Sequence, residues 1–224
     1  MTAPHGYPGI PGGYVEEVLD LGGRTVRYRR PAEPDALLAV PEVVAAFDRD
    51  GDAPYWPLLW PPAVPMARAV AAAEWKVGTT VLEVGCGIGL ASLAAASTSK
   101  WNVTASDRQA DAVMLAVANG ELNGFAIEGL VLDWHHPIER RFDLILGCEV
   151  IYDDRLHAPL LAMLDHMLAD DGDAWLADHG RMHAPLFADR ARDAGFAVSL
   201  MEEDGKPLSD FRTAAYQLLK LRRE

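Results

Sequence analysis

Short apolar runs alternate with segments of helical periodicity along most of the chain. Apolar runs of about four to eight residues between turn residues are typical of buried strands, and apolar residues spaced three and four apart indicate helices. The predicted strands are Thr80–Val84, Asn102–Ser106, Gly129–Leu132, Phe142–Leu146, Ala174–Ala177, Ala197–Met201 and Ala214–Leu221. The predicted helices are a segment around Ala63–Trp75, then Leu90–Ser97, Gln109–Leu122, Arg155–Ala169 and Ala184–Ala194. This alternation predicts an α/β fold: a doubly wound, seven-stranded, mostly parallel sheet with helices on both faces.

The last two predicted strands have no helical pattern between them. Residues 202–210, which include Gly205 and Pro207, are all that separates them. Parallel strands need a longer crossover, whereas antiparallel neighbours are joined by short connections. We therefore expect an antiparallel pair at the edge of the sheet.

The N-terminal part of the chain has a different pattern. Val15–Asp20 and Arg24–Arg30 flank two glycines, which predicts a β-hairpin with a glycine turn. A short helix is expected over Glu42–Phe47, and the Pro- and Gly-rich residues 1–13 are expected to be poorly ordered. This pattern divides the chain into an N-terminal extension, residues 1–53, and a larger domain, residues 54–224.

The segment Val81–Leu90 carries three glycines in a Gly-x-Gly-x-Gly spacing, between a predicted strand and a predicted helix. Backbone N–H groups at such a turn face a ligand, and glycines supply the unusual backbone conformations and keep side chains away from it. Dinucleotide-binding folds use a different spacing, Gly-x-Gly-x-x-Gly. Glu83, two positions before the first glycine, would repel a pyrophosphate but accept a hydrogen bond from an ammonium group. The turn thus favours S-adenosylmethionine as ligand, although glycines alone also let a helix pack closely on a sheet.

The next three predicted strands also end in polar and aromatic residues. These ends lie at the same edge of the sheet, where ligands of open α/β sheets bind. Asp107 ends the second strand, and an acidic residue there can bind both hydroxyls of a ribose. Asp133 and Trp134 end the third strand, where a carboxylate and an indole suit the amino group and the face of an adenine. Gly147–Tyr152 ends the fourth. Taken alone, Asp107 could equally well be the N-cap of the following helix, and Asp133 could simply end a strand. Taken together, the residues at these strand ends favour one ligand site.

Composition narrows the possible partners. The net charge of −13, from 20 basic and 33 acidic residues, argues against nucleic acid and suits either solubility alone or a cationic partner such as a lysine-bearing protein. No apolar run approaches the roughly 18 residues of a membrane helix, and we find no signal-peptide pattern. The two cysteines, Cys86 and Cys148, fit neither a disulfide framework nor a metal site. We expect a cytoplasmic protein with no membrane partner.

Three segments, together with the glycine turn, resemble the class I, seven-β-strand, S-adenosylmethionine-dependent methyltransferases. Within that class they resemble the branch of protein-lysine methyltransferases and nicotinamide N-methylase-like proteins. The segments are the Trp-Pro run Pro54–Pro61, the acid-x-x-Tyr sequence that closes Phe142–Tyr152, and Ala177–Arg181, which is close to an Asp-Pro-Gly-Arg element. The resemblance covers most of the chain and implies a Rossmann-like sheet. Two positions depart from it: Glu149 stands where many lysine methyltransferases have Asp, and His179 replaces a proline.

The resemblance also implies roles for site residues. Methyl transfer from a sulfonium needs an aligned, neutral amine and the exclusion of water, and it needs no metal. Glu149 would accept a hydrogen bond from the acceptor amine, Tyr152 would direct that amine, and Trp60 would cover the cofactor or the pocket. The alternative for Glu149 and Tyr152 is a helix start, with Asp153 and Asp154 as caps. The predicted cofactor contacts are Trp60, Glu83, Gly85, Cys86, Gly87, Gly89, Asp107, Arg108, Asp133, Trp134 and Cys148, and no metal site is expected.

These observations predict an N-methyltransferase that uses S-adenosylmethionine, releases S-adenosylhomocysteine and modifies a protein lysine. A methyltransferase for a small amine or N-heterocycle is the alternative if residues 1–53 close the mouth beside Tyr152. A protein that binds the cofactor without catalysis is the alternative if Glu149 points away from the methyl position. Glu83 and the glycine spacing disfavour a nicotinamide-dependent dehydrogenase.

Overall fold

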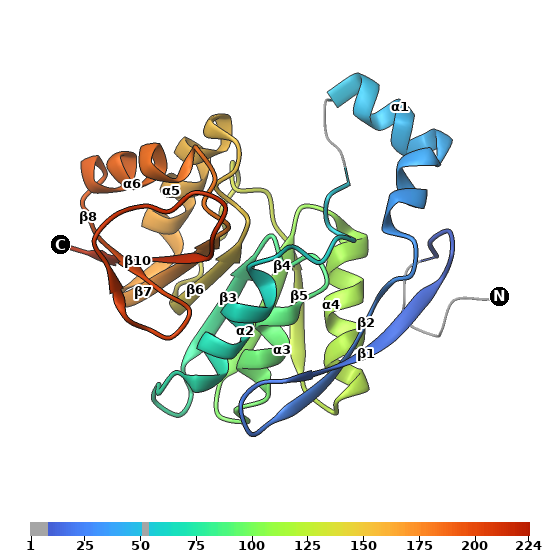
Figure 1. The fold of residues 1–224 in the computed structure, drawn as a ribbon, viewed down its shortest axis with the longest axis horizontal. Helices are drawn as coiled ribbons and strands as arrows, with labels where there is room; N and C mark the ends of the chain where they lie inside the picture. The colour runs from blue at the N-terminus through green and yellow to red at the C-terminus, as the bar shows by residue number, and fades with distance from the viewer. Residues whose placement is uncertain (1–8, 51–53) are drawn as a thin grey trace.

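The protein is built on an eight-stranded sheet in the order β5-β4-β3-β6-β7-β10-β8-β9 (Figure 1). The structure, a computed structural model, describes residues 9–50 and 54–224. The strands of the sheet are β3 (Thr80–Val84), β4 (Asn102–Asp107), β5 (Ile127–Val131), β6 (Phe142–Cys148), β7 (Leu168–Asp178), β8 (Phe196–Met201), β9 (Pro207–Leu208) and β10 (Gln217–Arg223). Strands β3 to β7 run parallel to one another, whereas β10 is antiparallel to β7. The chain order reverses between β3 and β6, so the ends of these two strands form the switch point at which such sheets bind ligands.

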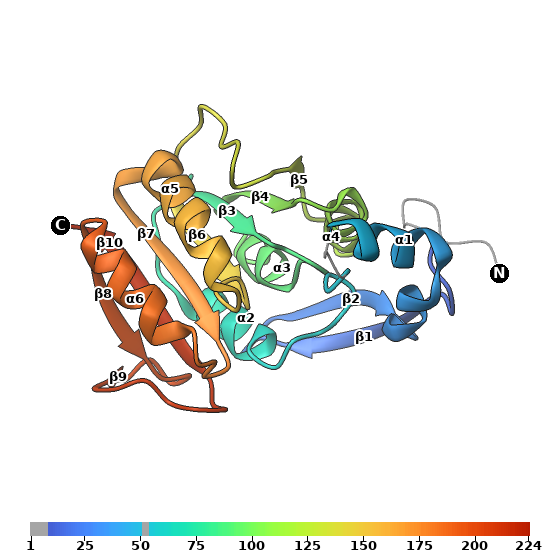
Figure 2. The same ribbon diagram turned by 90° about the horizontal axis from the view of Figure 1, so that it is seen from above.

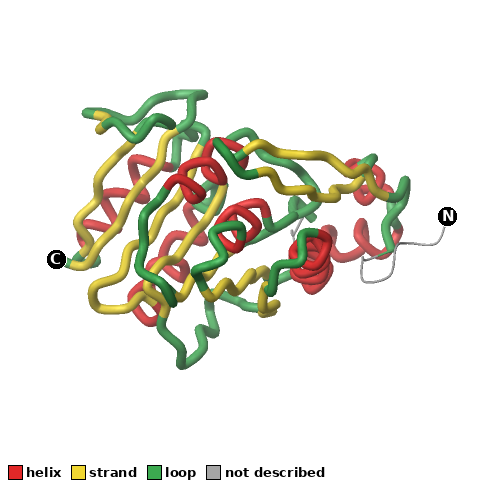
Figure 3. The backbone as a smooth tube through the Cα atoms, turned by 90° about the horizontal axis from the view of Figure 1, so that it is seen from below, coloured by secondary structure: helices red, strands yellow, loops and turns green. Residues whose placement is uncertain are grey.

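Helices cover both faces of this sheet (Figures 2 and 3). Since successive side chains of a strand point to opposite faces, Val81 and Leu82 belong to different core clusters. The first cluster includes side chains of α2, α3 and α4, and the second includes side chains of α5 and α6. The helices are α1 (Pro41–Asp50), α2 (Ala63–Ala72), α3 (Leu90–Ala96), α4 (Ala110–Leu122), α5 (His157–Met167) and α6 (Ala184–Asp193), with short 3-10 turns η1 (Pro34–Ala39) and η2 (Asp154–Leu156). The predicted α/β class and two-sided helical cover are confirmed.

Three details of the sheet differ from the prediction. β9 is an additional strand, too short to be recognised from its sequence, and it pairs with β8. β10 is antiparallel to β8 and the pair lies toward one end of the sheet as predicted, but β9 takes the edge position, and β10 lies between β7 and β8. The helix predicted to reach Ala169 ends at Met167, because Leu168 takes an extended backbone and begins β7 opposite Phe142.

The predicted hairpin is formed by β1 (Tyr14–Asp20) and β2 (Thr25–Pro31). Asn119 of α4 and Asn123, the residue that caps its C-terminus, hold β2 by pairs of hydrogen bonds to its backbone. The Asn119 amide accepts from Arg29 N at 2.8 Å and donates to Arg29 O at 3.0 Å, and Asn123 does the same with Arg27 at 2.8 and 2.6 Å. The outer edge of β2 is thereby paired, which removes an exposed strand edge. Of the predicted flexible start, residues 1–8 lie outside the described residues.

Gly89 lets helix α3 pack against α4. Its backbone is left-handed, with φ 79°, and it forms the N-terminal boundary of α3. A Cβ atom at this position would lie 2.6 Å from the Cβ of Ala116 on α4. The third glycine of the turn is therefore required by both the turn and the helix contact.

Gly89→Ala is expected to lower the free energy of unfolding by about 2–4 kcal/mol, because left-handed strain and a steric clash add together. Gly124→Ala is the matched control, since Gly124 has φ 73° but no atom within 4 Å of an added Cβ. It should cost only about 1 kcal/mol. Urea unfolding of both variants measures the difference, and equal losses would contradict the packing role of Gly89.

Candidate active site

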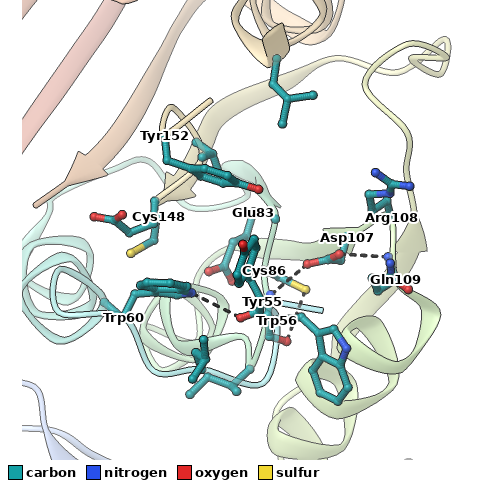
Figure 4. Close-up of a pocket in the computed structure, with 18 of the residues that line it drawn as sticks. Tyr55, Trp56, Trp60, Glu83, Cys86, Asp107, Arg108, Gln109, Cys148 and Tyr152 are labelled. Carbon is teal, nitrogen blue, oxygen red and sulfur yellow. Dashed lines mark hydrogen bonds between the residues drawn. The ribbon is translucent and has the colours of Figure 1, made fainter. Parts of the chain in front are cut away.

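One cavity of about 660 Å³ opens at the carboxyl ends of the parallel strands (Figure 4). Its walls come from the loops after β3, β4, β5 and β6 and from the segment Tyr55–Ala63. A volume of this size is typical of sites for cofactors and small ligands. The predicted site residues that line it are Trp60, Glu83, Gly85, Cys86, Gly87, Asp107, Arg108, Asp133, Trp134, Cys148, Glu149 and Tyr152. Gly89 does not line the cavity, and its contact with α4 explains its position.

Glu83 places a carboxylate at the base of the glycine turn. Glu83 is 2% exposed. Its Oε2 atom accepts a hydrogen bond from Ser92 N at 2.8 Å, and this bond joins the end of β3 to α3. Burial raises the pKa of the Glu83 carboxyl to about 7, because the charged form loses its hydration. A carboxyl held in this way is stabilised as a carboxylate by any cation that enters the cavity.

The first two glycines of the turn are constrained by the chain around them. Gly85 and Gly87 have φ 60° and 52°. A Cβ at Gly87 would lie 2.9 Å from the carbonyl oxygen of Trp56, and one at Gly85 would lie 3.0 Å from Val150. Both residues line the cavity, so the absence of side chains here also leaves the backbone open to it.

Asp107 lies at the end of β4, across the cavity from Trp60 and Tyr152 in the view of Figure 4. Its Oδ2 accepts from Gly87 N at 3.2 Å and its Oδ1 accepts from Gln109 N at 2.9 Å. Burial is the largest effect on this carboxyl and raises its pKa. Gln109 occupies the N-cap of α4, and no side chain caps that helix. The cap interpretation of Asp107 is therefore wrong.

Asp133 and Trp134 form an outer wall of the cavity after β5. The Asp133 side chain is 57% exposed and accepts a hydrogen bond from His135 N at 3.0 Å. Hydrogen bonds from the backbone and ring of His135 lower the pKa of the Asp133 carboxyl to about 2, so it is ionised at neutral pH. Trp134 packs beside Val150 in the second core cluster and reaches within 3.9 Å of a Cβ built at Gly85.

Glu149 and Tyr152 reach the cavity from the loop after β6. Glu149 has φ 55°, a left-handed conformation that is uncommon outside glycine and often found at functional sites. Its side chain is 2% exposed; Oε1 accepts from His179 N at 2.8 Å, and Oε2 accepts from Nε of Arg181. Neither Glu149 nor Tyr152 begins a helix, since η2 starts at Asp154 with Asp153 as its cap.

Sequence reasoning missed several residues that contribute to this site. Tyr55 and Trp56 line the cavity next to Trp60, and Arg181 lines it from the loop after β7. The aromatic run around Trp60 and the Ala177–Arg181 element contained the relevant signals. Which members of each segment face the cavity depends on contacts between distant parts of the chain.

Two further features of the described residues concern metal ligands and thiols. No group of three or more His, Cys, Asp or Glu side chains among them is arranged to hold a metal ion. Cys86 and Cys148 are free thiols, and burial raises the pKa of both, which disfavours the nucleophilic thiolate. A search of the same residues finds no helix with the length and apolar character needed to cross a bilayer.

The sheet order, the glycine turn and the cavity at the switch point define a class I methyltransferase fold. A sequence profile described as lysine methyltransferase matches residues 64–193, more than half of the 224 residues. The chain belongs to this lysine methyltransferase family, which confirms the predicted class and branch.

Two curated relatives are both electron transfer flavoprotein beta subunit lysine methyltransferases. The protein from Danio rerio is 31% identical over 137 residues, covering 56% of this chain and 53% of the relative. The protein from Rattus norvegicus is 28% identical over 143 residues, covering 58% and 55%. The chain thus spans about half the length of the curated relatives it matches.

Solved structures share the fold at low sequence identity. A TehB-like SAM-dependent methyltransferase from Corynebacterium glutamicum gives a TM-score of 0.61 at 18% identity, covering 87% of this chain and 100% of that one. Magnesium protoporphyrin IX methyltransferase from Synechocystis, solved with bound SAM, gives 0.56 at 16% identity, covering 72% and 78%. Likenesses at this identity establish the fold, and they confirm the predicted Rossmann-like architecture.

The residues present fit S-adenosylmethionine, the methyl donor that the family implies. The deeply buried residue Glu83 lines the cavity, where the donor's ammonium group would stabilise the charge of its carboxylate. Asp107, at the end of the adjacent strand, suits the ribose hydroxyls, and Trp134 suits the adenine face. A pyrophosphate is disfavoured at this position, because the carboxylates near the glycine turn would repel it.

Binding of S-adenosylhomocysteine, the product form of the donor, is expected to release protons near pH 7. The raised pKa leaves Glu83 partly protonated in the free protein, and the ligand's ammonium group favours the carboxylate. Affinity should therefore increase as the pH rises through about 7. Calorimetry in buffers of different ionisation enthalpy measures the released protons.

Glu83→Gln should release fewer protons and bind S-adenosylhomocysteine roughly tenfold to a hundredfold more weakly, because it loses a charged hydrogen-bond acceptor. Glu128→Gln is the control, since Glu128 is exposed and paired with Arg140. Unchanged proton release in Glu83→Gln would remove Glu83 from ammonium binding.

Proposed function

We propose that this protein is an S-adenosylmethionine-dependent N-methyltransferase that modifies a lysine side chain of another protein. The observation that carries the proposal is the composition of one cavity. Glu83, Asp107, Glu149 and Tyr152 all line it. The family membership of residues 64–193 supports the same reaction class.

Glu83, Asp107 and Trp134 are proposed to bind the ammonium, ribose and adenine groups of the donor. Gly85, Cys86 and Gly87 would lie along its amino-acid end, and Arg108, Asp133 and Cys148 complete the predicted contacts lining the cavity. Bound there, S-adenosylmethionine supplies an activated methyl group on a sulfonium. The protein's part is to fix its orientation and to keep water out.

Glu149 and Tyr152 are proposed to bind the acceptor amine. A buried carboxylate accepts a hydrogen bond from that amine and stabilises the positive charge that develops on its nitrogen. The Tyr152 ring and the Trp60 indole suit a cationic group and restrict its direction. Desolvation in this aromatic surrounding also favours the neutral amine, which is the nucleophilic form.

The alternative of a small amine or N-heterocycle acceptor depended on closure of the mouth by residues 1–53. Among the described residues, the cavity takes its lining from Tyr55 and later positions, and the hairpin lies against α4 instead. The names of both curated relatives also favour a protein acceptor. The non-catalytic alternative is disfavoured because Glu149 lines the cavity.

We propose the cytoplasm, or another reducing compartment, as the location, because Cys86 and Cys148 are both free thiols. The net charge of −13 supports a basic protein surface as partner and disfavours nucleic acid.

Incubation with radiolabelled S-adenosylmethionine tests the proposed activity. The acceptors are the host's electron transfer flavoprotein beta subunit, suggested by the names of the relatives, and separate protein and small-molecule fractions of a host lysate. We expect label on lysine in a protein fraction. Label confined to small molecules would support the alternative acceptor class, and no label anywhere would contradict methyltransferase activity.

Glu149→Gln is expected to lower methyl transfer by about 100-fold, while S-adenosylhomocysteine affinity stays within about threefold. Glutamine keeps the shape and an oxygen for His179 N but lacks the charge. Asp107→Ala should instead weaken the binding of S-adenosylhomocysteine, which calorimetry measures. A Glu149→Gln variant with normal turnover would rule out the proposed role of this carboxylate.

A further inference from the structure

Three aromatic rings gather at the part of the cavity that holds Glu149. The ring centroid of Tyr55 lies 6.0 Å from that of Trp60, at an interplanar angle of 71°, and 6.0 Å from that of Tyr152, at 83°. Trp60 Nε1 donates to Tyr55 O at 3.3 Å, which fixes the indole relative to this segment (Figure 4). Aromatic clusters of this kind bind alkylated ammonium groups through their π-faces.

Arg181 already occupies this cluster. Its Cζ atom lies 5.3 Å from the Trp60 ring centroid and 6.0 Å from that of Tyr152, both within cation–π range. Its Nε donates to Oε2 of the buried Glu149 carboxylate. The guanidinium thus makes the two kinds of contact that the acceptor's amino group requires, with the rings and with the carboxylate.

The backbone of Arg181 is held by contacts of its own, and its side chain is more exposed than that of its partner. Arg181 N donates to Asp178 Oδ1 at 2.9 Å, and a Cβ at the preceding Gly180 would lie 2.5 Å from Arg212 O. The Arg181 side chain is 38% exposed, compared with 2% for its partner Glu149. The arginine is therefore the more solvent-exposed member of the pair, and His179 N binds the Glu149 carboxylate independently of it, at 2.8 Å.

We propose that Arg181 occupies the acceptor's cation subsite until the acceptor displaces it, and that this competition determines acceptor specificity. This inference rests on the proposed function. If the subsite is open in about a tenth of molecules, the apparent affinity of every acceptor falls about tenfold. A lysine on a protein offsets that loss through contacts outside the cavity, whereas a small free amine has none. Arg181 thereby selects against small amines.

Binding of n-butyltrimethylammonium tests the competition directly, because this cation can be neither deprotonated nor methylated. Calorimetry at constant ionic strength, in the presence of S-adenosylhomocysteine, measures its affinity for the wild type and for Arg181→Ala and Arg181→Gln. Both variants should bind the probe about tenfold more tightly than the wild type, while Arg181→Lys, which keeps a cation, should gain less. Adding Glu149→Gln to Arg181→Ala should abolish the gain.

Controls separate this inference from folding and from the proposed function. Arg192→Ala on α6, which removes an exposed pair with Asp189, should bind the probe as the wild type does. S-adenosylhomocysteine affinity reports whether each variant keeps an intact site, and Arg181→Gln preserves bulk and hydrogen bonding if Arg181→Ala unfolds. Probe binding needs no methyl transfer, so a protein without lysine methyltransferase activity can still show the gain.

A second readout concerns specificity itself. With the protein acceptor at a saturating concentration and n-butylamine well below its KM, methyl transfer to n-butylamine relative to the protein should rise in Arg181→Gln by about the same factor as probe affinity, because only the unsaturated acceptor gains from a higher apparent affinity. The inference is overturned if both uncharged variants retain S-adenosylhomocysteine affinity but bind the probe no more tightly than the wild type. An unchanged ratio of the two methylation rates would also overturn it.

Discussion

The buried carboxyl of Glu83 is the group on which the geometry of the site depends. Oε2 of this residue accepts from Ser92 N at 2.8 Å, and its carbonyl oxygen accepts from Ser106 Oγ at 2.8 Å. These bonds join β3 to α3 and to β4 at the point where the sheet order reverses. Burying an acidic group is unfavourable, as the raised pKa of about 7 shows. A ligand that brings a positive charge to this point would relieve that cost, in agreement with the proposed binding of the donor's ammonium group.

The rest of the scaffold holds this point rigid from two sides. Asn119 is fully buried and donates to Ile88 O in the glycine turn at 3.0 Å as well as to the hairpin, so the hairpin and the turn share one side chain. On the opposite side, β7 fixes the loop that carries Glu149, since Glu149 N donates to Ala177 O at 2.9 Å. The residues proposed to bind the methyl donor and the acceptor therefore stand on strands of one sheet or directly after them, and the backbone ladder sets the relative positions of those strands.

Local pattern accounts for most of the fold, and long-range contacts account for what it missed. β3 begins and ends where the pattern predicts, because apolar alternation and the glycine turn bound it on both sides. The start of β7 depends on the pairing of Leu168 with Phe142, 26 positions away, whereas β9 was missed because two residues are too short to give a periodic pattern. Within the site, strand ends identify the carboxylates correctly as cavity-lining residues. Arg181 escaped notice because its pair with Glu149 joins residues 32 positions apart.

The central claim is that the ends of β3, β4, β5 and β6 enclose one S-adenosylmethionine. Hydrogen exchange of the full chain, followed by mass spectrometry with and without S-adenosylhomocysteine, tests it most directly. The account predicts slower exchange in the peptides around Gly85–Leu90 and Asp107–Gln109, with little change on α6. No protection, or protection confined to segments away from this cavity, would contradict it.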